Sequence, residues 1–374
     1  MNGALRVGSL FGIPFFIHPS WFLVLGLVTL SYGGNLASLF PPSAGVLPWL
    51  LGLSAALLMF ASVLAHELGH SVVAIAQGIE VKSITLFLFG GLANLDRESR
   101  TPAGAFSVAI AGPAVSLILF ALFSALKTAS GLAVPWVVLA SLLASVNLAL
   151  ALFNLIPGLP LDGGNVLKAL VWKLTGNPFR GTKFAARAGK IIGWIAIAAG
   201  LLPVFALGSF ETVWYAVIGW FVLQNAGRAA QSAELSDRMS QFTVADAITP
   251  NSPMVSEEMT LRQFANTFVI GQRAWRQYLV TNAAGEWVGT LAVDALRRIP
   301  TDEWPQVTVK SLMRPYREEA AIAADASLLD AVQMLEESQL TELPVLDREG
   351  LLLGLLEKTE IPELLRSRFA TPSA

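Results

Sequence analysis

The residues best suited to chemistry lie in one short stretch, residues 63–70, within a long apolar run. This stretch contains His66, Glu67 and His70 in the spacing H-E-x-x-H. On an α-helix, residues four apart lie on one face, one turn above the other. Two imidazoles placed in this way can bind a zinc ion, and the carboxylate between them can take a proton from water at the metal. The motif is short enough to arise by chance. Its position favours function, however, because ionisable groups are costly inside a membrane.

A catalytic zinc site needs a third protein ligand besides two histidines. Of the six acids in residues 1–230, Asp162 is distinguished by its surroundings, because it follows two prolines and precedes a double glycine. The prolines disfavour a helix through this segment. Irregular backbone at membrane depth is tolerated only inside protein or beside a wet cavity. We therefore expect Asp162 to be the third ligand, against the alternative that it only caps a helix beginning near Gly163.

The composition predicts a membrane protein with a soluble C-terminal part. Of the 374 residues, 54% are hydrophobic and 14% charged, with a mean hydropathy of +0.60. Residues 1–230 hold 12 Lys+Arg and 6 Asp+Glu, and residues 231–374 hold the remaining 13 and 21. The first part is therefore +6 and apolar, the second is −8, and neither is typical of a nucleic-acid binder. The chain has no Cys, which excludes disulfides and thiolate zinc ligands.

Six apolar runs approach the roughly 20 residues needed to cross a bilayer. The first lacks a small-residue cleavage site, so we expect a retained span and not a signal peptide. With the N-terminus inside, the outside segments carry Lys127 as their only Lys or Arg, and the positive-inside rule predicts cytoplasmic N- and C-termini. The six predicted spans are residues 14–32, 48–77, 104–126, 134–156, 189–207 and 211–227.

Three further features of residues 1–230 give weaker indications of structure or function. Residues 81–89 are β-branched and aromatic and precede Gly90-Gly91, which predicts a strand pair. This pair is either a plain connector or an edge strand beside the active site that can pair with an extended substrate. We expect Ala111-Gly112-Pro113 to serve helix packing. We expect His18, near one end of a span, to be a hydrogen-bonded structural residue.

The motifs together resemble the site-2 protease family of intramembrane zinc metalloproteases. The resemblance rests on residues 66–70 and on the pattern Asn154-x-x-Pro157-x-x-Pro160-x-Asp162-Gly163. Phe89-Gly90-Gly91, Ala111-Gly112-Pro113 and residues 17–21 are similar to further motifs of the family. The resemblance covers about residues 10–225. It implies zinc held by His66, His70 and Asp162, with Glu67 as general base and Asn154 as a polar partner for the substrate or the oxyanion. Asn165 departs from the family, in which many members have Arg.

After a predicted linker at residues 231–240, the chain holds two copies of one unit, expected at residues 241–300 and 301–374. Tyr278-Leu279-Val280 is repeated by Leu343-Pro344-Val345, about 65 residues later. The predicted β-α-β-β-α unit resembles a tandem pair of CBS domains, which often bind adenine nucleotides. Glu357 stands where nucleotide-binding copies have a hydroxyl, and an acid there repels phosphate. We expect a structural or dimer-forming module in preference to a nucleotide sensor.

The expected fold is a polytopic α-helical membrane domain, residues 1–230, followed by a soluble α/β tandem CBS module. The membrane domain has six transmembrane helices and a small membrane-associated β element. The resemblance implies a zinc endopeptidase of regulated intramembrane proteolysis. Its substrate would be a single-span membrane protein, such as an anti-sigma-like or membrane-tethered regulator. Two alternatives remain: a CBS-regulated transporter, which gives Glu67 no task, and a non-catalytic scaffold, which predicts a missing ligand or base.

Overall fold

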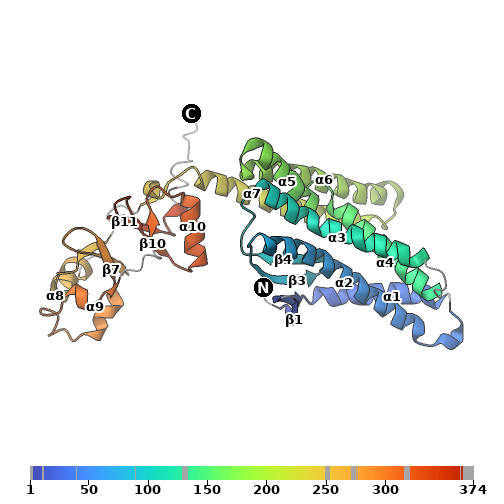
Figure 1. Ribbon diagram of the computed structural model, residues 1–374, viewed down its shortest axis with the longest axis horizontal. Helices are drawn as coiled ribbons and strands as arrows, with labels where there is room; N and C mark the ends of the chain where they lie inside the picture. Colours follow the sequence, from blue (N-terminus) through green and yellow to red (C-terminus); the bar gives the residue numbers. More distant parts are fainter. Residues whose placement is uncertain are drawn as a thin grey trace. The chain divides into compact units, whose positions relative to one another are not determined.

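The chain forms two compact units in the computed structural model, Met1–Glu234 and Leu235–Ala374 (Figure 1). The structure describes residues 3–364 except 11, 39, 89, 129–133, 249–252, 271–274, 276, 316–320 and 363. Phe89, which belongs to one of the family-like motifs, therefore lies outside the described residues.

Long helices dominate the described part of the first unit. Five of them, α1, α2, α3, α4 and α6, are long and apolar enough to cross a membrane. The sixth predicted span, residues 211–227, lies in α7, which is not among these five because its second half is polar. The helices are α1 Ser20–Ala37, α2 Leu47–Ala76, α3 Pro102–Thr128, α4 Val134–Asn154, α5 Asp162–Thr175, α6 Pro178–Leu207 and α7 Val213–Met239, and one 3-10 turn, η1, covers Pro42–Ala44.

A four-stranded sheet accompanies these helices and confirms the predicted strand pair. The strands lie in the order β1-β2-β3-β4, so β4 is at an edge. β1 and β2 are antiparallel, as are β3 and β4, and β2 and β3 are parallel. Apolar side chains of the sheet, among them Ile13 and Ile84, pack with Ala74 of α2. The strands are β1 Leu5–Leu10, β2 Ile13–Ile17, β3 Val81–Phe87 and β4 Gly90–Leu95.

The first predicted span begins later than expected, because residues 14–17 belong to β2 and not to a helix. His18 follows this strand, and its backbone N–H donates to the carbonyl of Leu86 at 2.9 Å. Its Nδ1 lies 2.8 Å from the hydroxyl of Ser20, the first residue of α1. His18 thus joins the sheet to the start of α1, which agrees with the predicted structural role.

Helix α2 packs against α1, α3, α4, β3 and β4. Small residues allow the closest approaches, as is usual between membrane helices. A Cβ atom on Gly52 would lie 2.7 Å from the carbonyl oxygen of Thr29 on α1. A Cβ atom on Gly69 would lie 2.9 Å from the carbonyl oxygen of Ala111 on α3. The helix that carries the H-E-x-x-H motif is therefore held closely on both sides.

The second unit contains two small sheets that repeat one pattern, as the sequence predicts. The antiparallel hairpins β6–β7 and β10–β11 have matching registers, in which Tyr278 pairs with Leu291 and Leu343 with Leu356. The sheet orders are β5-β6-β7-β8 and β11-β10-β9. The elements are η2 Val244–Ala247, β5 Met254–Ser256, α8 Leu261–Phe264, η3 Ala265–Val269, β6 Gln277–Thr281, β7 Trp287–Ala292, η4 Val293–Arg298, α9 Val309–Leu312, β8 Arg314–Pro315, β9 Ile322–Ala323, α10 Leu328–Glu337, β10 Glu342–Leu346 and β11 Leu352–Glu357.

Each of the two cores in this unit contains the first segment of the other copy. Val244 packs in the core formed by the second copy, with Leu328 and Leu343. Val309 packs in the core of the first copy, with Tyr278. Each copy therefore supplies the segment that completes the core of the other, across the boundary predicted at residue 300. The predicted linker, residues 231–240, is helical up to Met239, the last residue of α7.

Candidate metal centre

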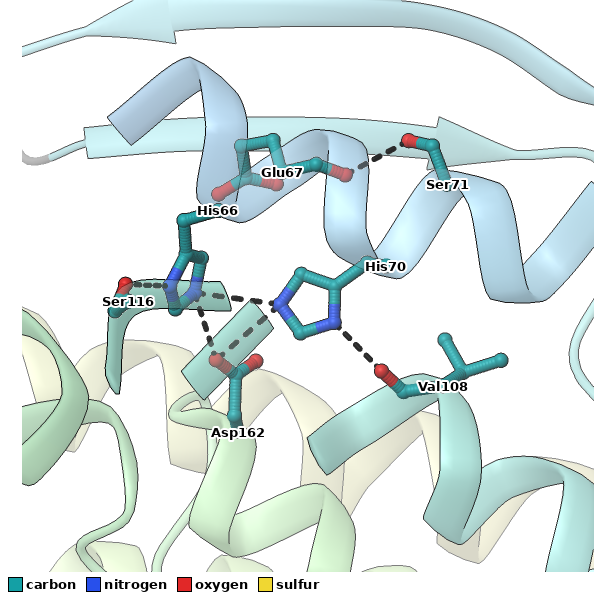
Figure 2. A network of polar contacts seen from close by, with 7 residues as sticks. All are labelled: His66, Glu67, His70, Ser71, Val108, Ser116 and Asp162. Carbon is teal, nitrogen blue, oxygen red and sulfur yellow. Dashed lines mark hydrogen bonds and ion pairs between the residues drawn. The ribbon is translucent and has the colours of Figure 1, made fainter. Parts of the chain in front are cut away.

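Three side chains predicted as ligands converge at one point (Figure 2). His66 and His70 lie on α2, and Asp162 is the first residue of α5. The Oδ2 atom of Asp162 is 3.1 Å from His66 Nε2 and 3.3 Å from His70 Nε2. The two Nε2 atoms are 3.3 Å apart. His66 is 2% exposed, so this group lies inside the helical bundle.

The spacing of these three atoms fits a tetrahedral zinc site. Ligand atoms at about 2.0–2.1 Å from a tetrahedral zinc are roughly 3.3 Å from one another. The three observed separations, 3.1, 3.3 and 3.3 Å, match one face of such a tetrahedron. A catalytic site keeps its fourth corner for water or substrate. Two imidazoles and one carboxylate are a usual donor set for catalytic zinc.

Both imidazoles are oriented through their second nitrogen. His70 Nδ1 lies 2.7 Å from the carbonyl oxygen of Val108, and because a carbonyl only accepts, this nitrogen carries the proton. His66 Nδ1 lies 2.9 Å from the hydroxyl of Ser116, which is fully buried on α3. Such partners fix the tautomer and the ring orientation of metal-binding histidines. They turn both Nε2 atoms toward Asp162 (Figure 2).

Asp162 does not cap the helix that it begins. Leu161 occupies the N-cap position of α5, with no side-chain cap hydrogen bond, and the Asp162 carboxylate points to the two histidines. The following double glycine is required by the tight turn between α4 and α5. A Cβ atom on Gly163 would lie 2.5 Å from the carbonyl oxygen of Ile156, and one on Gly164 would lie 2.6 Å from that of Gly158. The sequence prediction of a ligand over a cap is consistent with this geometry.

Two further glycines make room for the ionisable groups. A Cβ atom on Gly112 would lie 2.6 Å from His66 Nε2 and closer still to His70 Nε2. The sequence predicts only a packing role for residues 111–113, but here the packing partners are the imidazoles themselves. A Cβ atom on Gly91 would lie 2.9 Å from Glu67 Oε1. Gly91 therefore allows β4 to pass directly over this carboxylate.

A cavity of about 360 Å³ opens beside the three converging side chains. Glu67 and Asn154, the last residue of α4, both line it. Asn165, the departure from the family pattern, lines it as well. One wall is the edge strand β4, and the backbone of Ala93 interacts with the Glu67 carboxylate. All five site residues predicted from the sequence therefore belong to one site.

The sequence prediction missed several residues of this site. Ser116 and the carbonyl of Val108 orient the imidazoles, and Gly112 makes space for them. The only signal for Ser116 is a small polar residue one turn after Ala111-Gly112-Pro113 in an apolar span. Lys168 and Glu98, which line the cavity as an ion pair, were not singled out.

Comparisons with known proteins address the identity of the chain. Residues 54–133 and 125–196 match the model of peptidase family M50, and residues 309–366 match that of the CBS domain. A candidate zinc metalloprotease of Synechocystis sp. is 54% identical over 99% of this chain and 97% of its own length. The chain belongs to peptidase family M50, the site-2 proteases.

Two more proteins are similar to this M50 chain. Rip3 of Mycobacterium tuberculosis, a candidate zinc metalloprotease, is 38% identical over 84% of this chain and 81% of its own length. A solved structure, the site-2 protease from Methanocaldococcus jannaschii, is 29% identical and covers 61% of this chain and 95% of its own, with a TM-score of 0.43. From its family matches and the Synechocystis relative, the present chain is an integral-membrane zinc metalloprotease with a C-terminal CBS domain. The transporter and scaffold alternatives are left without support.

Proposed function

We propose that this M50 chain is an intramembrane endopeptidase that cleaves single-span or membrane-tethered proteins within or near their membrane segment. The observation that supports it most strongly is the convergence of His66, His70 and Asp162 beside Glu67, with the histidines and Glu67 on α2, a helix apolar enough to cross a bilayer. In this proposal the three converging side chains hold the zinc. When bound, zinc supplies the Lewis acidity that makes water a nucleophile near neutral pH and polarises a carbonyl group.

Glu67 is the proposed general base. It follows a zinc-binding histidine in sequence and lines the cavity that a substrate would enter. Its carboxylate takes the proton of the attacking water and then gives that proton to the leaving amine of the cleaved bond. Gly91 supports this role, because any larger residue there would displace the carboxylate.

Asn154 is the proposed stabiliser of the oxyanion. It lies at the end of α4, eight residues before Asp162, and lines the same cavity as Glu67. A side-chain amide aimed at the reacting carbonyl can donate a hydrogen bond to the negative oxygen that develops during attack.

The edge strand β4 is the proposed docking element for the substrate backbone. A helix hides its carbonyl groups in hydrogen bonds, so a membrane-spanning substrate must unwind before attack. An unwound segment can pair with the free edge of a sheet. β4 is such an edge and lines the cavity beside Glu67. This supports the edge-strand alternative over the plain connector.

We further propose that both termini and the CBS module are cytoplasmic, on the basis of the positive-inside distribution. The cleft between the two CBS sheets, about 590 Å³, is lined by Glu342. Glu357 pairs with Glu342 across β10 and β11. Two neighbouring acids disfavour phosphate groups, which supports a structural or dimer-forming role over adenine-nucleotide sensing.

Cleavage of a single-span test substrate by purified full-length protein in detergent tests the proposal. The comparison includes wild type, chelator-treated wild type, Glu67→Gln and the control Glu80→Gln, which changes an exposed acid after α2. We expect cleavage by wild type and Glu80→Gln only, with zinc retained in Glu67→Gln. Cleavage by Glu67→Gln at the wild-type rate would contradict the assignment of the base. Full activity after zinc removal would contradict the mechanism.

A further inference from the structure

We propose that Lys168 forms a subsite for an acidic side chain of the substrate, about three residues from the cleaved bond, and that Glu98 occupies this subsite when no substrate is bound. The inference rests on the proposed endopeptidase function and adds a specificity determinant to it.

Lys168 lines the cavity beside the metal centre. Lys168 is 8% exposed, and among the described residues that line the cavity it is the only Lys or Arg. The other charged or ionisable groups of the cavity wall are His66, Glu67, His70 and Asp162, all assigned to the metal site and its base, and Glu98.

Glu98, in the segment that connects β4 to α3, forms an ion pair with Lys168. Its Oε2 lies 2.6 Å from Lys168 Nζ, and its side chain is 78% exposed. A buried charge without a partner is unfavourable, so Lys168 is more stable with an anion beside it. The exposed carboxylate of Glu98 is easily rehydrated when it leaves. One carboxylate can therefore replace another at low cost, whereas a substrate Lys or Arg at this place would be repelled.

Helix α5 gives the distance of the subsite from the reacting centre. Asp162, Asn165 and Lys168 are spaced three apart on α5, so each is a neighbour of the next along the helix, and all three line the cavity. The six residues from Asp162 to Lys168 correspond to a rise of about 9 Å along the helix. An extended peptide advances about 3.3 Å per residue. A substrate bound in extended form thus brings the side chain about three residues from the cleaved bond to Lys168.

Strand β4 leads to the same place. Gly91 lies over Glu67, and the chain continues through Leu95 to Glu98. A substrate strand paired with β4 would therefore run from the base to the ion pair. The ion pair of Glu98 and Lys168 thus joins α5 to the segment that follows β4.

The test uses a family of single-span substrates that carry Glu, Gln or Lys at the third or fourth residue on either side of the cut. Full-length wild type, Lys168→Gln, Lys168→Glu and Lys173→Gln are compared by kcat/KM. Lys173 is an exposed residue of the same helix and serves as the matched control. A charge-assisted hydrogen bond corresponds to at least about a tenfold effect. At one of these positions we expect wild type and Lys173→Gln to prefer Glu over Gln by about tenfold, Lys168→Gln to lose the preference, and Lys168→Glu to prefer Lys.

Glu98→Gln is a second variant that leaves Lys168 in place. It removes the competing carboxylate, so the KM for the Glu substrate should fall while the KM for the Gln substrate changes little. Zinc content and gel filtration confirm that each variant is folded. Equal cleavage of all substrates by wild type, or an unchanged preference in folded Lys168→Gln, would overturn the subsite while leaving the proposed protease intact. Absence of any cleavage by zinc-loaded wild type would contradict the proposed function itself, and the subsite with it.

Discussion

Gly112→Ala adds a single methyl group at the most crowded point of the metal centre. The new Cβ atom would lie 2.6 Å from His66 Nε2, 2.7 Å from His70 Cε1 and closer still to His70 Nε2. Non-bonded heavy atoms normally approach to about 3.5 Å. The imidazoles, or helix α3, must therefore move by about 1 Å.

A displacement of this size is incompatible with metal binding, because ligand distances in zinc sites tolerate about ±0.2 Å. Loss of a residue that only orients a ligand typically reduces metal affinity 10–100-fold. We expect Gly112→Ala to reduce zinc affinity by about 100-fold, the upper end of this range, because both imidazoles are affected. The assay is competition for zinc between the purified protein in detergent and a chromophoric chelator, with cleavage of a test substrate measured in parallel.

Two other glycines provide matched controls. Gly26→Ala changes a residue of α1 at which, apart from its chain neighbours and the nearby backbone of α1, no heavy atom lies within 4 Å of the new methyl group. It should leave zinc affinity unchanged. Gly69→Ala crowds the contact between α2 and α3, with Ala111 O at 2.9 Å from the new methyl group. It should lower thermal stability more than zinc affinity. Wild-type zinc affinity in Gly112→Ala would refute the argument that this glycine makes room for the imidazoles.

Ser116→Ala removes the hydrogen-bond partner of His66, and zinc affinity measured by chelator competition should fall 10–100-fold; unchanged affinity would show that the hydroxyl does not orient the ring. Ser62→Ala removes the 3.0 Å hydrogen bond from Asn147 between α2 and α4, and should destabilise the full-length protein by about 1 kcal/mol in thermal unfolding; a stability equal to wild type would contradict this. Burial, and then the acid opposite it on β11, raise the pKa of Glu342. The CBS module should therefore lose stability as pH rises from the unfolded value of about 4.3 through the raised folded value, and Glu342→Gln should be more stable than wild type at pH 7 and lack this loss. A pH dependence identical in both proteins would contradict the assignment.

The chemistry of the site could be predicted because it depends on local spacing and on the cost of charge in an apolar environment. His66 and His70 are joined by one helical turn, so their proximity follows from sequence alone. Asp162 lies about 90 residues away, and its role could be inferred only from the unusual prolines and glycines around it and from the order of the spans. The structure brings its carboxylate to within 3.1 Å of His66.

The partners of the site could not be predicted, because they depend on how helices pack. Ser116 and Gly112 act through the contact between α2 and α3, and an apolar span gives no signal for which of its small residues faces a histidine. The place of Lys168 in the site could not be predicted for a similar reason, because its ion-pair partner Glu98 is 70 residues distant in sequence.

The boundaries of the elements differ from the predicted ones where pairing between distant segments overrides local composition. The apolar stretch before His18 suits a membrane helix, yet residues 13–17 form a strand that pairs with β1 and, through residues 15–17, with β3. In the second unit the sequence shows the repeat, but it does not show that each copy supplies a segment to the core of the other. Val244 and Val309 occupy equivalent places in the repeat, and each packs in the core of the other copy.

The central claim is that His66, His70 and Asp162 together bind zinc. The zinc content per chain of purified wild type, Asp162→Ala and Glu67→Gln, measured by mass spectrometry of the metal after gel filtration, tests it most directly. The structure predicts one zinc per chain in wild type and in Glu67→Gln, and little zinc in folded Asp162→Ala. Equal zinc in wild type and Asp162→Ala would contradict the three-ligand site.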